Sequence, residues 1–188
     1  LTGEKSPRFG YRVRKEFTAN AKNQSIEITY TLINESGETR KVAPWEISRV
    51  PNGGILFFDA KEATPANNMK GFPFEYKMKA AWYVLDEDQN HRKINADGKG
   101  WLAFFDKGLL FVKKFPDLKP SEPAPAEAEI QIYANPGKTF VEIEEQGAYT
   151  TLNPGEELSW TVCWYLLPTD LPAEPSKALL KKALSVIK

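Results

Sequence analysis

The sequence contains very few residues of the types that carry covalent or metal chemistry. Of 188 residues, one is a cysteine (Cys163) and one is a histidine (His91). One cysteine excludes an internal disulfide, and one residue of each type cannot build a Cys/His zinc site. Lys and Arg total 25, as do Asp and Glu, so the balanced charge gives no reason to expect nucleic acid or an anionic membrane as a partner. No apolar run approaches the roughly 20 residues that span a bilayer.

The chain begins at Leu1 with neither an initiator methionine nor a signal-peptide pattern. A removed leader, a trimmed chain or a missing upstream segment would each explain this start. We expect a removed leader and hence a periplasmic or secreted protein, although the absence of disulfides also fits a cytoplasmic location. The sequence does not indicate an oligomeric state.

The local patterns predict β-strands over most of the chain. In residues 25–33, Ile26, Ile28, Tyr30 and Leu32 alternate with polar residues, as in a half-buried antiparallel strand. Further strands are predicted at 42–50, 74–85, 100–105, 109–115, 129–133, 139–144 and 157–167. So many antiparallel strands need two packed sheets, which makes an all-β antiparallel sandwich the expected fold class.

Two segments interrupt the strand pattern. Residues 119–128 are rich in proline and lack apolar anchors, which predicts an exposed loop with polyproline character. Near the C-terminus, Ser176 can cap a short helix whose apolar residues have helical spacing and should pack on the sandwich. We therefore expect a β-sandwich domain over residues 1–170 and a helical appendage over 171–188.

Catalytic and metal-binding motifs are scarce. His91 lies in a polar run that looks like a solvated loop, so a Ser-His-Asp triad is not expected. Asp86, Asp88 and Asn90 have the spacing of a calcium loop, but His91 stands where the sharp turn requires glycine. An ordinary charged hairpin explains this run better, and we expect neither a metal nor a cofactor.

Tryptophans and paired glutamates form the more informative pattern. All five tryptophans, among them Trp45 and Trp101, lie on predicted strands, where they fill a core or stack on sugar rings. Glu142 and Glu144 alternate with apolar residues and point to one face of their strand, an arrangement that suits acid–base chemistry on a sugar. A solvent-exposed sheet face carries such carboxylates equally well.

Several motifs, taken in order, carry a resemblance to a known superfamily. Residues 139–166 resemble the closing strands of galactose-mutarotase-like (aldose 1-epimerase-like) proteins, with Glu144-Glu145-Gln146, a Leu-Asn-Pro-Gly-Glu turn at 152–156 and a final aromatic strand. A closer likeness is to an uncharacterised bacterial branch of that superfamily. Its motifs are matched by Ala-Pro-Trp at 43–45, Gly-Gly at 53–54, Gly-Trp-Leu-Ala-Phe at 100–104 and Leu-Phe-Val-Lys at 110–113. The resemblance covers about residues 9–168.

The resemblance implies a supersandwich with a sugar site on a concave sheet face. Because family domains are commonly longer, N-terminal strands of such a supersandwich could be missing from this chain. The family's catalytic base falls on Glu144, whereas the family's catalytic histidine falls near Trp45. Indole does not titrate near neutrality, so Trp45 cannot replace that histidine as a proton donor.

Three functions follow, in order of preference. The first is a protein that binds or processes a sugar or oligosaccharide in a mutarotase-like cleft, where ordinary mutarotase chemistry is doubtful. The second is an active sugar epimerase or polysaccharide lyase with Glu144 as base and a cation such as Lys113 or Arg49. The third is a non-catalytic structural or interaction module. The expected ligand-binding residues beside Glu144 are Trp45, Arg49, Trp101, Lys113 and Glu142.

Overall fold

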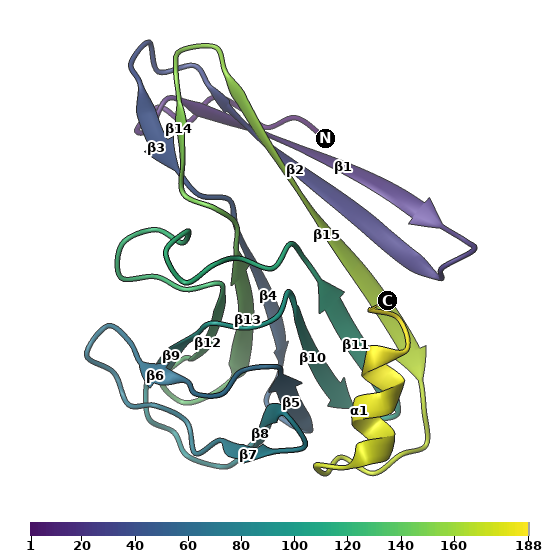
Figure 1. Cartoon of the computed structure of the whole chain (residues 1–188). Helices are drawn as coiled ribbons and strands as arrows, with labels where there is room; N and C mark the ends of the chain where they lie inside the picture. Colours follow the sequence, from purple (N-terminus) through teal and green to yellow (C-terminus); the bar gives the residue numbers. More distant parts are fainter. Residues whose placement is uncertain (188) are drawn as a thin grey trace.

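The computed structural model describes residues 1–187 and contains two large antiparallel sheets (Figure 1). The eight-stranded sheet has the order β1 (Tyr11–Asn20), β2 (Ser25–Asn34), β15 (Glu157–Pro168), β11 (Leu109–Lys114), β10 (Trp101–Asp106), β5 (Ile55–Phe58), β8 (Ala80–Val84) and β7 (Glu75–Lys77). The five-stranded sheet has the order β4 (Trp45–Pro51), β13 (Phe140–Gln146), β12 (Ile130–Ala134), β9 (Arg92–Ala96) and β6 (Thr64–Pro65). A two-stranded ribbon joins β14 (Thr150–Leu152) to β3 (Arg40–Val42). The predicted antiparallel β-sandwich is confirmed.

The main core lies between the two large sheets. On β12 and β13, apolar residues such as Ile132 and Ile143 are fully buried against Leu56 and Leu102 of the eight-stranded sheet. Because successive strand residues point to opposite faces, the residues that alternate with this core lie on the outer face of the five-stranded sheet. That outer face carries Glu144.

A second core covers the opposite face of the eight-stranded sheet. The helix α1 (Lys177–Leu184) packs there through Leu179 and Ala183, which are both fully buried. The Ser176 side chain accepts a hydrogen bond from the Leu179 amide, which confirms the predicted cap. Lys188, the last residue of the predicted appendage, lies outside the described residues. Within residues 1–187, no helix is long and apolar enough to cross a membrane.

The structure corrects the predicted elements at three places. The strand expected over 42–50 divides at Ala43-Pro44 into β3 and β4, which belong to different sheets. The strand expected over 74–85 is a hairpin, because Met78 and Lys79 take positive φ angles of 57° and 65° and turn the chain. The polar run at 86–92 is a loop with exposed residues as far as His91, but Arg92 at its end begins β9 and is only 6% exposed.

Candidate functional site

Polar side chains line up across the outer face of the five-stranded sheet. The strand register places Glu144 of β13 beside Gln131 of β12, and Gln131 beside Asn95 of β9. Glu144 and Gln131 are almost completely buried. One side-chain oxygen of each of the three residues is buried and has no hydrogen-bond partner within residues 1–187. We call these three residues the acceptor row.

Glu144 sits at one end of the acceptor row, between a lysine and a tryptophan. Its Oε2 is 3.5 Å from Nζ of Lys93, and that ammonium lies 5.0 Å from the centre of the Trp45 ring. Burial raises the pKa of Glu144, while Lys93 and the Trp45 indole oppose this shift and Glu142 adds to it. The carboxyl therefore keeps its proton to a higher pH than a solvated glutamate does.

Glu142 and Arg49 form a separate pair on the same outer face. Nε of Arg49 donates to Oε1 of Glu142 at 2.9 Å, and the guanidinium stacks 4.4 Å from the Phe140 ring centre. The Arg49 side chain is 67% exposed, so this pair faces solvent at the edge strand β4. Three predicted site residues, Trp45, Arg49 and Glu142, thus share one face with Glu144.

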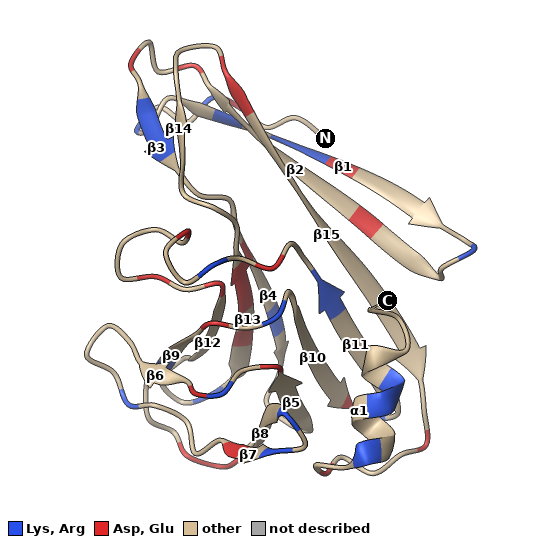
Figure 2. Cartoon of the chain, viewed as in Figure 1, with Lys and Arg blue, Asp and Glu red and all other residues tan. Residues whose placement is uncertain are grey.

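The structure does not bring Trp101 or Lys113 to that face. Trp101 is 3% exposed and belongs to the second core, on the far side of the eight-stranded sheet. Lys113 points into the space between the sheets, where its Nζ contacts Glu46 and lies 2.6 Å from Oε2 of Glu145. Figure 2 shows the acidic stretch of β13 and the basic end of β11 in the two different sheets.

The Lys113 cluster has its own electrostatics. Burial raises the pKa of Glu145 well above its usual range, and Lys113 only partly offsets this. Burial also acts on Glu46, but there it is outweighed by hydrogen bonds from Glu145, Lys113 and Ser48, so the pKa of Glu46 is lowered. The two pKa shifts run in opposite directions, so Glu46 loses its proton more readily than Glu145 and is the carboxylate that pairs best with Lys113.

The proline-rich segment 119–128, here called the strap, lies against the outer face. The Ala124 amide donates to Oε1 of Gln146, Nε2 of Gln131 donates to the Ala128 carbonyl, and Nδ2 of Asn95 donates to the Ala126 carbonyl. In Figure 1 the segment between β11 and β12 extends toward the side of the five-stranded sheet that faces away from the eight-stranded sheet. The strap is the loop that the sequence predicts, but its backbone is hydrogen-bonded to side chains of the five-stranded sheet.

Lys93, Gln131 and Asn95 were missed by the sequence reasoning. The sequence does contain a signal for Gln131, which stands between two isoleucines of its strand. The same alternation of polar and apolar residues places Glu142 and Glu144 on the outer face. No comparable signal marks Lys93, whose partner Glu144 lies 51 residues away.

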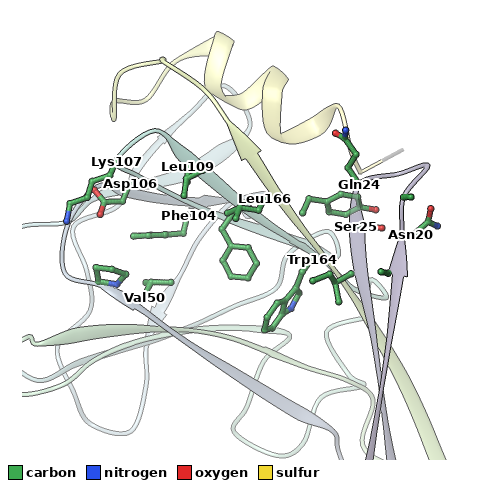
Figure 3. A pocket seen from close by; sticks show the side chains of 16 residues that line it. Asn20, Gln24, Ser25, Val50, Phe104, Asp106, Lys107, Leu109, Trp164 and Leu166 are labelled. Carbon is green, nitrogen blue, oxygen red and sulfur yellow. The ribbon is translucent and has the colours of Figure 1, made fainter. Parts of the chain in front are cut away.

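Two of the cavities in the structure differ in the kind of ligand that they could hold. One, of about 560 Å³, adjoins the acceptor row at Asn95 and is lined by polar and charged side chains together with strap residues 126–128. The other, of about 690 Å³, opens between the sheets and is lined mainly by apolar side chains such as Phe104, Trp164 and Leu166 (Figure 3). The first can hydrogen-bond a hydroxylated ligand, whereas the second suits an apolar group.

Metal ligation is not indicated in the part of the chain that the structure describes. Over residues 1–187, no group of three or more His, Cys, Asp or Glu side chains could hold a metal ion. The aspartates of the run with calcium-loop spacing pair with basic side chains instead. Asp86 and Asp88 both pair with Arg92, and Asp86 also accepts from Lys138.

Several solved structures share this architecture, among them two candidate aldose 1-epimerases and a galactose mutarotase-like protein. A candidate aldose 1-epimerase from Escherichia coli K12 shares 13% identity, with a TM-score of 0.63 over 89% of this chain and 64% of that one. A second candidate epimerase, from Klebsiella pneumoniae, shares 11% identity and a TM-score of 0.63 over 100% of this chain and 54% of that one. A galactose mutarotase-like protein from Lactobacillus casei shares 10% identity, with a TM-score of 0.56 over 88% and 68%.

These likenesses define the fold of the chain. It has the galactose-mutarotase-like fold, and it spans between about half and two thirds of the length of the two epimerase structures. No protein-family model and no curated protein sequence matches the chain.

Proposed function

We propose that this protein binds or processes a carbohydrate on the outer face of the five-stranded sheet, with Glu144 as the central group. The observation that carries the proposal is the buried Glu144 carboxyl beside Lys93 and Trp45, in a row with Gln131 and Asn95. Carboxylate and amide groups hydrogen-bond sugar hydroxyls, and the half-exposed Trp45 ring offers an apolar face to a pyranose. The named functions of proteins with the same fold are consistent with such a ligand.

Binding without ordinary mutarotase chemistry is the form of this proposal that we prefer. Ring opening requires a base on the anomeric hydroxyl and an acid on the ring oxygen. Glu144 can supply the base, but Trp45 cannot supply the proton that a histidine would give. In this proposal Glu144 accepts a hydrogen bond from a sugar hydroxyl while Trp45 stacks on the ring.

An active epimerase or lyase is the second candidate, and one observation favours it. The Lys93 ammonium lies 3.5 Å from the Glu144 carboxylate and is 5% exposed, so a base and a cation stand together out of bulk water. A lyase needs this combination to abstract a proton and to neutralise a uronate carboxylate. Lys93 thereby takes the part that the sequence reasoning gave to Lys113 or Arg49.

Titration of the protein with α-glucose, α-galactose and uronate oligosaccharides tests the proposal. Followed by calorimetry, the substitution Glu144→Gln should weaken binding by ~10-fold or more, because a hydrogen bond to a charged group contributes about 1.5–3 kcal/mol. Glu87→Gln, at an exposed position, is the matched control and should bind as the wild type does. Equal binding by Glu144→Gln and the wild type would contradict the proposal.

The same mixtures separate the two candidates. Anomeric NMR signals report epimerisation, and ultraviolet absorbance of unsaturated products reports lyase turnover. Binding with neither signal supports the preferred form. Turnover that disappears in both Glu144→Gln and Lys93→Met supports the enzyme.

A further inference from the structure

We propose that the strap occupies one end of a longer binding groove and that an oligosaccharide, rather than a single sugar, displaces it. In this proposal the ligand follows the strand register from Glu144 through Gln131 to Asn95, the member of the acceptor row that lines the polar cavity of about 560 Å³. This inference rests on the proposed function and adds the length of the ligand and the movement that admits it.

The acceptor row is longer than one sugar ring requires. Glu144 and Asn95 are two strands apart, which corresponds to roughly 10 Å at about 4.8 Å per inter-strand spacing. Oε1 of Glu144, Oε1 of Gln131 and Oδ1 of Asn95 are each buried without a hydrogen-bond partner within residues 1–187. Buried polar atoms are normally satisfied, so a row of three unpaired acceptors indicates a missing set of donors. Sugar hydroxyls are donors of this kind.

The polar cavity continues the row past Asn95. Thr64 of β6 pairs in register with Asn95, and both residues line the cavity. Glu127 of the strap lines it as well, and its Oε2 is another buried acceptor without a partner in the described chain. A second sugar unit would therefore meet polar partners in the cavity while a first unit meets Glu144.

The amides of the acceptor row that a ligand would use now hold the strap. Gln131 and Asn95 each donate one amide N–H to the strap, to the carbonyls of Ala128 and Ala126, while their side-chain oxygens have no partner within residues 1–187. Carbonyl oxygens of the strap thus occupy positions that hydroxyl oxygens of a glycan can take. Strap and ligand compete for the same donors, so binding along the whole row requires the strap to leave.

The strap is suited to leave because hydrogen bonds, and no buried side chain, hold its middle: the Ala124 amide donates to Gln146, and the Tyr149 amide donates to the Glu122 carbonyl at 2.8 Å. Leu118 and Glu129 on either side of it are buried, whereas no residue of 119–128 is buried. The strap also forms turns of its own, since the Glu122 amide donates to the Lys119 carbonyl and the Glu127 amide donates to the Ala124 carbonyl, and these bonds do not depend on the sheet. Ala126 has a φ of 66°, in the left-handed region that disfavours a side chain, so its release relieves local strain.

The substitution Gln146→Leu tests the strap apart from the acceptor row. Gln146 holds the strap through the Ala124 amide but is not a member of the row. Its loss should speed hydrogen exchange of residues 121–128 by about 5-fold, because one hydrogen bond contributes about 1 kcal/mol. Gln89→Leu, at an exposed position, is the matched control, and thermal unfolding verifies that both variants remain folded.

Glucose, cellobiose and cellotriose are the probes for ligand length. We expect cellotriose to bind the wild type at least 10-fold more tightly than glucose and to increase exchange of residues 121–128. We also expect Gln146→Leu to bind cellotriose several-fold more tightly than the wild type or Gln89→Leu. These results together would support both the groove and its displaceable strap.

Two other results would overturn the inference in different ways. If Glu144-dependent binding is equal for the three probes and exchange of the strap is unchanged, the proposed function stands and the groove does not. If neither the wild type nor Gln146→Leu binds any of the probes, the groove is refuted, and the titrations with galactose and uronates decide the proposed function separately.

Discussion

At the scale of single residues, two adjacent glutamates of β13 have different surroundings, because successive strand residues point to opposite faces of a sheet. Glu144 points to the outer face toward Lys93, whereas Glu145 points into the sandwich toward Lys113. Both are nearly inaccessible, and burial raises the pKa of both. Lys113 contacts both Glu46 and Glu145 in the core, so removing any one of the three leaves a buried polar group without a partner.

Removing the ammonium from this cluster should be strongly destabilising. Lys113→Met keeps the length of the side chain but leaves Glu46 and Glu145 without their cation, a change that costs about 3–5 kcal/mol in buried pairs. Urea unfolding at neutral pH measures the loss. Lys22→Met, at an exposed position, should change the free energy of unfolding by less than about 0.5 kcal/mol. A Lys113→Met protein as stable as this control would show that the cluster is not held by its charges.

At the scale of elements, Glu129 fastens the end of the strap to the sandwich. Its two oxygens accept from the amides of Gly100 at 2.8 Å and Leu118 at 3.2 Å, although the side chain is fully buried. Burial raises its pKa from 4.5 to about 7, against the opposing effect of these two amides. The loop that covers the candidate site thus begins beside a carboxyl that titrates near neutral pH.

Stability should fall as pH rises through this window. Between pH 4.5 and about 7 the folded chain keeps a proton on Glu129 that the unfolded chain has released, so raising the pH favours unfolding. The full effect is about 3 kcal/mol, since one pKa unit corresponds to about 1.4 kcal/mol. Glu129→Gln mimics the protonated group and should lack this dependence. Urea unfolding at several pH values should show the two curves diverging above pH 4.5, and parallel curves would contradict the assigned pKa.

The sequence pattern predicts elements well where one face of a strand is apolar, as in β2 and β13. It fails for β9, because two basic residues are buried there: Arg92 pairs with the nearby Asp88, and Lys93 pairs with Glu144, which only the fold brings near. The pattern also places Glu142 and Glu144 on one face correctly. It cannot tell which of two layers a strand joins, and for this reason Lys113 and Trp101 were expected beside Glu144.

At the scale of the whole molecule, the two sheets differ in width. The eight-stranded sheet continues through β15, β2 and β1 beyond the edge strand β4 of the five-stranded sheet. Apolar side chains on this extension are therefore left exposed, with Phe17 at 55%, Ile26 at 45% and Leu166 at 57%. The apolar cavity of Figure 3 lies where the wider sheet extends past the edge of the narrower one. There Val50 of β4 faces Trp164 and Leu166 of β15.

A dye that fluoresces in apolar surroundings should detect this cavity in the native protein. A cavity of about 690 Å³ with mostly apolar walls can hold an anilinonaphthalene sulfonate, whose fluorescence rises on leaving water. Leu166→Asp removes an apolar wall of the cavity and places a negative charge at its mouth, so it should lower the dye signal several-fold, because the carboxylate repels the sulfonate of the dye. Val84→Asp is the control, since Val84 is 51% exposed but lies outside the cavity. Equal dye binding by both variants would show that the dye binds outside this cavity. The difference in sheet width would then not create a binding site between the two sheets.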